Sequence, residues 1–559
     1  MGLINVGNFL CLLAASSWVC ATDVPVKIIA FNDFHGQLEA PGNLRATAAN
    51  TTPTIPVGSV EWMAGYVEAL KAENPNNVVV SAGDLIGATP LVSALFHDEP
   101  TIETMNLLGL EFNAVGNHEF DEGRNELLRM QYGGCHPTDP NTCMGATVGT
   151  PVPFEGARFA FLAANVQDVV SKKTLFPPYA IKTFGKVRVA FIGMTLKETP
   201  TIVSPSGVAG LEFTDEAAAV NGLIPKLRAR GVKAIVVLIH QGGTQPVSQA
   251  ADTINACIGN LQGTPIAPIV SKLDNEVDLV ISGHTHQAYN CLLPNKNGRL
   301  ISVTSANSAG RVLSDINIQV NPVSGEVTNV EAQNKLVDRT ATGVAPNAEI
   351  AAIVTQYRAL AMPIANRVIG EITGAMPDSP ANAAGETALG DVIADAQLQA
   401  TAAIGFGEAV VAFMNPGGIR SPGFSFVSSP MGEGDGKVTY GEAFTVQPFG
   451  NSLVTLTLTG EQIHILLEQQ FTGCNAATAP ASWDYPTSDT LGQSFNRILQ
   501  VSAGFEYEWS PVGPACDKVN PMSIRINGVV VNPLLTYRIT VNNFLADGGD
   551  KFYVLGKGS

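Results

Sequence analysis

The sequence predicts a larger layered α/β domain followed by a smaller α+β domain. Three observations support this fold class. The 559 residues are too many for one ordinary domain. Short apolar, β-branched runs alternate with helix-like segments up to residue 321. After a helical stretch that begins at residue 348, strands and helices are mixed in a different pattern.

Six apolar runs in the first part are predicted to form strands. They are continuous rather than alternating, which is typical of strands that are covered on both faces. Segments 60–71 and 214–230 carry helical patterns between them. The six runs are Val26–Phe31, Val78–Val80, Phe112–Val115, Val187–Ile192, Ile235–Ile239 and Val277–Ile281.

The second part is predicted to follow a connecting helix at Ala348–Ala361, which Pro363 is expected to end. Residues 22–335 then form the first domain, 336–365 the linker helix and 366–559 the second domain. The second domain has predicted strands at Val410–Met414, Leu453–Leu458 and Tyr537–Val541, predicted helices at Leu389–Thr401 and Gly460–Gln470, and a predicted surface loop at Ser421–Gly436.

The first 21 residues are predicted to be a cleaved secretory signal peptide. Phe9–Val19 is mostly apolar, and Val19 and Ala21 are small residues of the kind found at a cleavage site. A short N-terminal anchor and a buried strand are the alternatives. No later segment is apolar for 18 residues, so we expect no transmembrane span. The predicted location is secreted or extracellular, which includes a periplasm or a cell surface.

The cysteines fit an oxidising compartment. Six cysteines follow residue 21 and allow 15 pairings, with free buried thiols as the alternative. Without a Cys-x-x-Cys motif, a cysteine zinc site is not expected. Asn50 begins a glycosylation sequon. Proximity in the sequence favours the pairs Cys135–Cys143, Cys257–Cys291 and Cys474–Cys516.

The formal net charge of −17 argues against a polyanionic partner. A chain this acidic has no general attraction for DNA, RNA or anionic membranes. If the substrate is a phosphate ester, local cations must overcome this field.

Polar side chains follow five of the six predicted strands of the first domain. The carboxyl ends of strands in open α/β sheets converge on one crevice, where ligands bind. Five of the eight histidines of the chain belong to this set. The set is Asp33, His35, Asp84, Asn117, His118, His240, His284 and His286.

These side chains are predicted to hold two divalent metal ions. Carboxylate, imidazole and amide oxygen suit Zn²⁺, Mn²⁺ or Fe²⁺. The seven ligands other than His118 are too many for one ion, but suit two ions that share a carboxylate. Two ions about 3.5–4 Å apart can clamp an in-line displacement at phosphorus. Asp-x-His alone is commonly a solvated loop, and Gly-Asp alone is commonly a turn or a helix cap. Gly-His-Thr-His and Gly-Asn-His-Glu are more specific, and all five motifs in order, each after a strand, favour the metal site.

These motifs resemble those of calcineurin-like metallophosphoesterases, and the string Gly-Asn-His-Glu-Phe-Asp-Glu-Gly at 116–123 resembles the 5′-nucleotidase family. The resemblance continues in the second domain at segments 385–391, 415–420, 447–451 and 543–550. It implies a four-layer α/β/β/α metallophosphoesterase domain followed by a smaller α+β substrate-binding domain. It also implies that the two domains rotate about the 348–361 connection.

The resemblance implies a role for each site residue. The first metal would be held by Asp33, His35 and His286, the second by Asn117, His240 and His284, and Asp84 would bridge them. His118, oriented by Asp121, would face the substrate phosphate. The substrate would be bound by Phe449 and Phe544 around the base, Asp550 at the ribose, Arg420 and Asn415 at the terminal phosphate, and further by Asn117, Gly418 and Asn451.

One departure from the family pattern concerns phosphate binding. Family members often carry another phosphate-binding arginine beside the glutamate of the helix-entry motif. Here Gly385 precedes Glu386, and no Lys or Arg lies between Arg367 and Arg420. Phosphate binding is therefore expected to be weaker, or the substrate different, unless Arg497 or another distant cation compensates.

The predicted function is hydrolysis of nucleoside 5′-phosphates by hydroxide that two metal ions activate, with His118 as proton donor. A 2′,3′-cyclic nucleotide phosphodiesterase with 3′-nucleotidase activity would use the same architecture. An inactive nucleotide-binding surface protein is the third possibility, although every predicted ligand and His118 are present. The expected partner is a nucleotide and not a nucleic-acid polymer.

Overall fold

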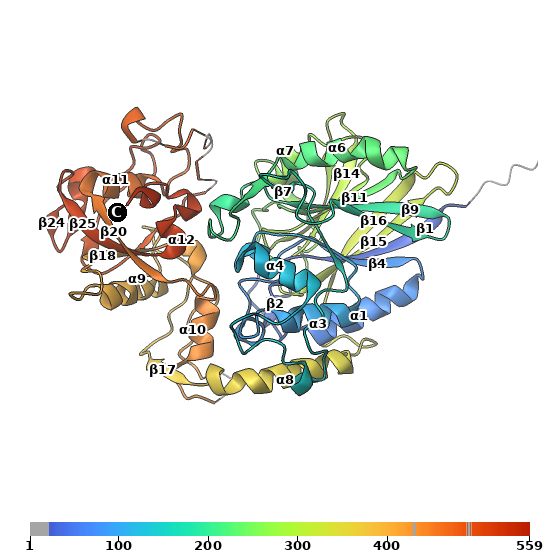
Figure 1. The fold of residues 1–559 in the computed structure, drawn as a ribbon, viewed down its shortest axis with the longest axis horizontal. Coiled ribbons are helices and arrows are strands. Elements are labelled where there is room, and N and C mark those ends of the chain that lie inside the picture. Colours follow the sequence, from blue (N-terminus) through green and yellow to red (C-terminus); the bar gives the residue numbers. More distant parts are fainter. Residues whose placement is uncertain are drawn as a thin grey trace, which may run out of the picture.

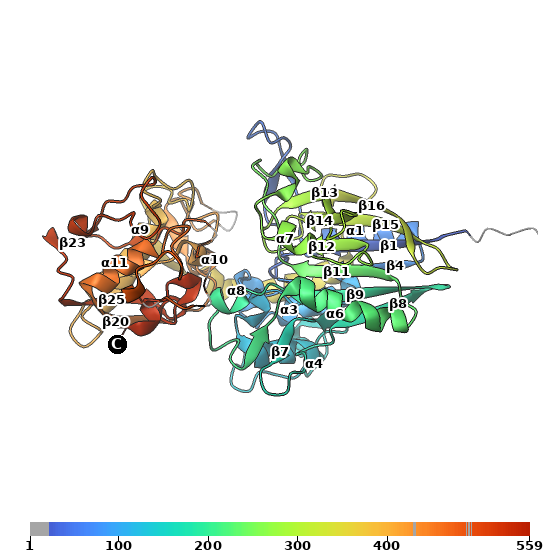
Figure 2. The same cartoon turned by 90° about the horizontal axis from the view of Figure 1, so that it is seen from above.

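The computed structural model describes residues 22–428, 432–483, 485–487, 489, 492–493 and 495–558. It consists of two lobes joined by a long helix (Figures 1 and 2). The predicted signal peptide, residues 1–21, lies outside the described residues.

Two six-stranded sheets form the centre of the first lobe. One sheet has the order β16 (Val327–Leu336), β15 (Val312–Val320), β1 (Val24–Phe31), β4 (Asn77–Ser81), β5 (Phe112–Ala114) and β6 (Ala160–Leu162). The other has the order β13 (Ala288–Pro294), β14 (Leu300–Ala306), β12 (Leu279–Ser282), β11 (Ala234–His240), β9 (Val187–Thr195) and β8 (Tyr179–Phe184). Strands β1, β4, β5 and β6 are parallel, as are β9, β11, β12 and β14, and all six predicted strands are confirmed.

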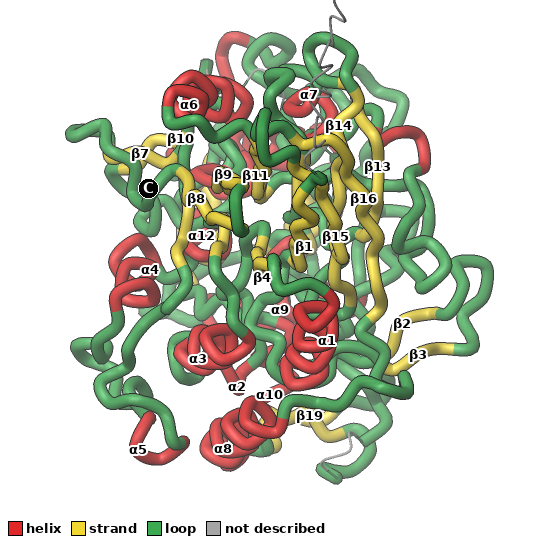
Figure 3. Tube along the Cα trace, turned by 90° about the vertical axis from the view of Figure 1, so that its right-hand side faces the viewer, coloured by secondary structure: helices red, strands yellow, loops and turns green. Residues whose placement is uncertain are grey.

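The two sheets pack against each other, and helices cover their outer faces (Figure 3). Strand β1 shows why its sequence is continuously apolar. Val26 and Ile28 belong to the core between the sheets, whereas Ile29 and Phe31 belong to the core under the helices. This α/β/β/α order confirms the implied fold class. The covering helices are α1 (Val60–Glu73) and α3 (Glu99–Leu108) on one sheet and α6 (Glu216–Ala229) and α7 (Ile266–Val270) on the other.

The connecting helix α8 (Ala348–Ala365) packs into the first lobe. Ile350 and Tyr357 are buried in the core that α1 and α3 share. The Tyr357 hydroxyl donates a hydrogen bond of 2.7 Å to Glu103 of α3. The rotation of the two domains stays a prediction. Because α8 is fixed to the first lobe, such a rotation would have its hinge after Ala365.

The expectation that Pro363 ends this helix is wrong, because α8 continues to Ala365. A proline lacks an N–H, so it removes one hydrogen bond to the carbonyl four residues earlier. Pro363 lies in the exposed last turn, where water can solvate that carbonyl. The loss of one bond there does not stop the helix.

The second lobe is a four-stranded sheet with helices around it, as the predicted α+β class requires. Its strand order is β20 (Leu453–Thr459), β25 (Thr536–Asn542), β18 (Val411–Met414) and β21 (Gln500–Val501). Its helices are α9 (Ala388–Thr401), α10 (Tyr440–Val446), α11 (Gly460–Glu468) and α12 (Asn543–Ala546).

The remaining helices and strands complete both lobes. They are helices α2 (Leu91–Ala94), α4 (Gly123–Tyr132) and α5 (Gly145–Val148), and strands β2 (Asn43–Arg45), β3 (Thr54–Pro56), β7 (Val166–Asp168), β10 (Leu211–Phe213), β17 (Val368–Glu371), β19 (Lys437–Thr439), β22 (Phe505–Glu506), β23 (Arg525–Ile526) and β24 (Val529–Val530).

The three disulfides favoured by sequence proximity are confirmed as Cys135–Cys143, Cys257–Cys291 and Cys474–Cys516. Asn50 is exposed, and its glycosylation stays a prediction. Over the described residues, every helix is too short or too polar to cross a bilayer.

His97 joins two loops of the first lobe through charged partners. Its Nδ1 lies 2.6 Å from Glu122 and its Nε2 lies 3.0 Å from Asp139, in the loop that the Cys135–Cys143 disulfide closes. The hydrogen bond with Glu122 is the main cause that raises the pKa of His97 to about 9. The imidazolium therefore holds the loops together at neutral pH.

We predict that His97→Gln removes a pH-dependent part of the stability. The folded-state pKa is raised above the ordinary value of 6.5, so the stabilisation is complete below that pH and is lost as the pH rises through about 9. In urea unfolding, the variant should be less stable than the wild type by on the order of 1–3 kcal/mol at pH 6 and nearly equal at pH 10. His464→Gln is the control. An equal deficit at both pH values would contradict this assignment.

Candidate active site

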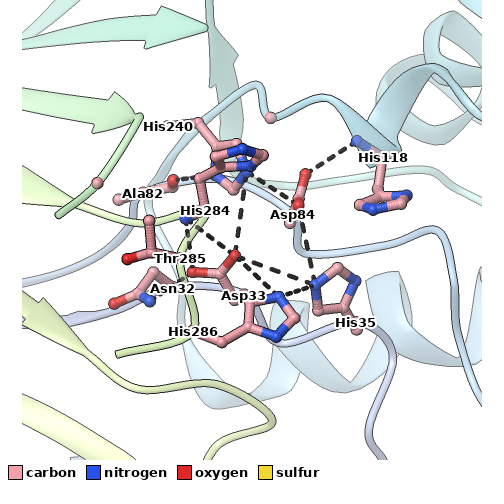
Figure 4. A network of polar contacts seen from close by, with 12 residues as sticks. Asn32, Asp33, His35, Ala82, Asp84, His118, His240, His284, Thr285 and His286 are labelled. Carbon is pink, nitrogen blue, oxygen red and sulfur yellow. Dashed lines mark hydrogen bonds and ion pairs between the residues drawn. The ribbon is translucent and has the colours of Figure 1, made fainter. Parts of the chain in front are cut away.

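The predicted ligands gather at one edge of the two stacked sheets (Figure 4). Asp33 and His35 follow β1, Asp84 follows β4, and His240 is the last residue of β11. His284 and His286 follow β12, which lies beside β11 in the second sheet, while Asn117 follows β5 of the first sheet. Because these strands are parallel within each sheet, their carboxyl ends deliver side chains from distant parts of the chain to one place.

The ligand atoms form two groups. Those of Asp33, His35 and His286 lie within 4.8 Å of one another, and so do those of Asp84, His240 and His284. Asp84 Oδ2 is 2.9 Å from His240 Nε2 and 3.8 Å from His35 Nε2, so it lies between the groups. This division matches the two ligand sets that the resemblance implies, with Asp84 in the bridging position.

His35 and His240 each direct one ring nitrogen into this space. His35 Nδ1 donates to the Gly87 carbonyl at 2.9 Å, and His240 Nδ1 donates to the Ala82 carbonyl at 2.8 Å. Each ring therefore directs its Nε2 inward, as metal-ligating histidines do. His35 Nε2 lies only 3.0 Å from His286 Nε2.

Two of the predicted ligand atoms, Asn117 Oδ1 and His240 Nε2, are buried without a hydrogen-bond partner among the described residues. The His240 atom lies 2.9 Å from Asp84 Oδ2 but is not aligned with it for a hydrogen bond. Buried polar atoms are rarely left unpaired in proteins. Together with the inward-facing imidazoles, they fit divalent cations bound at this edge.

The backbone at the site is strained. A positive φ is uncommon in residues other than glycine, and such conformations concentrate at functional sites at a cost of about 1–3 kcal/mol each. Five of the seven predicted ligands adopt it, namely Asp33 (49°), His35 (48°), Asp84 (48°), His284 (72°) and His286 (55°).

Burial and neighbouring charges fix the protonation of the ligands. Although burial opposes its ionisation, His240, His118 and His35 hold the pKa of Asp84 well below its ordinary value. Burial, with His240 nearby, lowers the pKa of His284 to about 3. Burial, by contrast, raises the pKa of Asp33 to about 7, and although burial opposes it, the carboxylates of Asp84 and Asp33 raise the pKa of His240 to about 9. Metal binding would displace these protons, because it requires anionic carboxylates and neutral imidazoles.

Glu119 positions the ligands and was not predicted from the sequence. Its carboxylate accepts hydrogen bonds from the backbone N–H groups of Asp84 (3.0 Å), Leu85 (2.8 Å) and Gly116 (2.6 Å). It therefore ties the loop after β4 to the loop after β5. Its place in the Gly-Asn-His-Glu motif was the available signal, but only the folded chain shows what it contacts.

His118 is paired with Asp121 and faces the second lobe. Its Nδ1 donates to Asp121 Oδ2 at 2.8 Å, and its Nε2 lies 3.2 Å from Arg420 Nη2. Burial alone would lower the pKa of His118, but the carboxylates of Asp121 and Asp84 raise it above its ordinary value. This arrangement suits a proton donor that works near neutral pH.

One cavity between the lobes contains every predicted catalytic and substrate-binding residue. The first lobe contributes Asn117, His118 and Asp121, and the second contributes Asn415, Gly418, Arg420, Phe449, Asn451, Phe544 and Asp550. Arg497, which the sequence suggested as a compensating cation, also lines the cavity. Four further lining residues had no role predicted from the sequence, namely Ile202, Val203, Ser204 and Gly417.

The second-lobe side chains divide into two sets. Phe449 stacks on His118 with ring centres 5.8 Å apart, and Arg420 lies 4.9 Å above the Phe449 ring. Asn415 instead donates to Asp550 at 2.9 Å. The implied roles of Asn415 and Arg420 at the terminal phosphate stay predictions. Enclosure of a base by Phe449 and Phe544 stays a prediction.

A third group of possible ligands, His97, Glu126 and His136, lies outside this site. His97 is already held by carboxylates, which favour its protonated form. Glu126 is paired with Arg129 at 2.6 Å. Both groups are engaged in ion pairs, so we do not assign a metal here.

Family comparisons agree with this geometry. The calcineurin-like phosphoesterase family matches residues 26–288, and the 5′-nucleotidase C-terminal domain family matches residues 368–557. A solved 5′-nucleotidase precursor from Thermus thermophilus superimposes with a TM-score of 0.70 at 25% identity, covering 96% of this chain and 93% of that one.

Curated relatives are similar along nearly the whole chain. Endonuclease YhcR of Bacillus subtilis is 32% identical over 95% of this chain, but the chain spans only 38% of that protein. Cell wall protein Lmo0130 of Listeria monocytogenes is 28% identical over 99% of this chain and 67% of its own length.

We predict that Gly116→Ala disrupts metal binding. A Cβ at this position would lie 2.2 Å from Asp84 Oδ1 and 2.5 Å from its backbone nitrogen, so Asp84 must move. Affinity for Zn²⁺ or Mn²⁺, measured by calorimetry and metal analysis, should fall by about 10–100-fold. Gly222→Ala is the control, because a Cβ there meets no atom within 4 Å. Unchanged metal affinity would refute this role of Asp84.

Proposed function

Since this chain belongs to the 5′-nucleotidase family of phosphoric ester hydrolases, we propose that it releases phosphate from nucleoside 5′-phosphates in a metal-dependent reaction. The cavity between the lobes supports this proposal most directly. The cavity adjoins the ligand groups through Asn117 and His284, and it is lined by aromatic and polar side chains of the second lobe. A nucleotide would fit in the same order, with its phosphate at the ligand groups and its sugar and base against the second-lobe side chains.

The proposed cofactor is a pair of divalent cations. Asp33, His35 and His286 would hold one, Asn117, His240 and His284 would hold the other, and Asp84 would be shared. When bound, such ions activate water and neutralise charge on the phosphate.

His118 and Arg420 would act on the phosphate itself. Asp121 holds the imidazole so that Nε2 faces the cavity, where a protonated ring can donate to the leaving oxygen. Among the described residues Arg420 forms no ion pair with a carboxylate, so its guanidinium is available to a phosphate oxygen.

The remainder of the cavity would bind the nucleoside. Phe449 and Phe544 offer aromatic faces for the base, which tolerate different bases because each base has a π-face. Asp550 and Asn415 offer hydrogen-bonding groups for the ribose.

We also propose that the mature chain works outside the cytoplasm. Its three disulfides suit an oxidising compartment. The similarity to a cell wall protein of Listeria supports the same location.

A phosphate-release panel tests the proposed substrate. The metal-loaded protein should release phosphate from AMP. ADP, ATP, UDP-glucose, 2′,3′-cyclic AMP and single-stranded DNA are assayed in parallel, and chromatography resolves their products because cleavage of a diester or pyrophosphate bond need not release inorganic phosphate. The cyclic nucleotide tests the phosphodiesterase alternative, and the DNA tests for the nuclease activity that the similarity to an endonuclease suggests. Turnover of either without turnover of AMP would reject the proposal.

We predict that His118→Asn lowers kcat for AMP by roughly 100-fold or more while the bound metal stays near the wild-type level. The reason is that His118 lies beside the ligand groups without belonging to either of them: its backbone N–H donates to Asp84, and its ring packs edge-on against His35 with centres 5.1 Å apart. Metal analysis and steady-state kinetics on the same sample measure both. If the variant lost its metal, His118 would belong to the metal site rather than to proton transfer.

A further inference from the structure

Arg497 lines the cavity but has no role in the function proposed above. Its Nη1 donates to Asp550 Oδ1, and its side chain is 18% exposed. The guanidinium lies 4.6 Å above the ring of Phe495. Its Nε is buried without a hydrogen-bond partner in the described part of the chain. Arg497 is thus held in place beside Asp550, with donors that the protein does not use fully.

The backbone of Asp550 needs such support. Asp550 and Lys551 adopt positive φ angles of 53° and 62°, which are unfavourable for residues with a side chain. Arg497 binds one carboxylate oxygen and Asn415 binds the other at 2.9 Å. Gln493 donates to the Asp550 carbonyl at 2.6 Å. These contacts fix both the backbone and the carboxylate of Asp550.

The two arginines of the cavity differ in charge balance. Arg420 contacts His118 in the first lobe and has no carboxylate partner among the described residues. Arg497 is neutralised by Asp550 within the second lobe. A neutral pair with spare donors and acceptors suits an uncharged polar group, whereas an unpaired guanidinium suits a phosphate. This charge balance makes Arg497 better suited to the sugar than to the phosphate.

We propose that Arg497 is a positioning residue that presents the Asp550 carboxylate to the ribose hydroxyls and so sets a preference for ribose-bearing phosphate esters. The proposal rests on the function proposed above. It also means that Arg497 does not replace the phosphate-binding arginine that is absent beside Glu386.

The test compares substrates that differ only at the ribose. The wild type should prefer AMP to 2′,3′-dideoxy-AMP in kcat/KM by at least about 10-fold. Arg497→Gln should raise KM for AMP by about 10-fold with little change in kcat, and should abolish most of this preference. Its kcat/KM for dideoxy-AMP and for p-nitrophenyl phosphate should stay within about 2-fold of the wild type. Arg497→Lys, which keeps the charge, should restore part of the preference.

Arg525→Gln, at a partly exposed arginine in the same lobe, is the matched control and should change none of these values. Equal losses of Arg497→Gln on AMP and dideoxy-AMP would overturn the proposal, because Arg497 would then act on the phosphate or on the fold. An unchanged preference would overturn it as well.

Failure of the proposed function is recognised separately. If the wild type hydrolyses p-nitrophenyl phosphate but not AMP, calorimetry with adenosine and 2′,3′-dideoxyadenosine tests the ribose contact without hydrolysis. Tighter binding of adenosine by the wild type that Arg497→Gln removes would support the proposal. Equal binding of both nucleosides by the wild type would overturn it.

Discussion

The edge of the two stacked sheets brings together two carboxylates and four imidazoles, of which Asp33, His35, Asp84 and His240 are buried whereas the His286 side chain is 42% exposed. Asp33, Asp84 and His240 are at most 1% exposed. Charges and lone pairs buried in this way are costly unless an opposite charge compensates them. Five of the candidate ligands also keep a positive φ, which adds backbone strain. Divalent cations would relieve these costs, so the fold and the inferred cofactor depend on each other.

The second lobe completes a site that the first lobe leaves unfinished. His118 and Asp121 come from the first lobe, whereas Arg420 and Phe449 come from the second and contact His118. The metal ligands all belong to the first lobe. Any change in the angle between the lobes would separate the two sets, so the lobe arrangement determines whether the cavity is complete. Helix α8 restricts where such movement can occur, because its buried face is part of the first-lobe core.

Much of the fold and most of the site could be predicted from the sequence for a specific physical reason. Strands covered on both faces require continuous apolar runs, and parallel strands bring their carboxyl ends together. The polar residues after each run, such as Asp33, Asp84 and His284, therefore had to converge. The disulfide pairs followed from proximity, because each closes a loop of 8, 34 or 42 residues.

Only the tertiary structure decided which side chains of segments far apart in the sequence contact one another. Glu119 holds two loops through backbone N–H groups, which carry no sequence signal. Asn415 turns to Asp550, and Arg497 reaches the same carboxylate from 53 residues away. Pro363 remains helical because its turn is exposed. The sequence by itself determined the strands, the lobes and the side chains that gather at the sheet edge; which side chain meets which across the cavity depends on packing that no local pattern encodes.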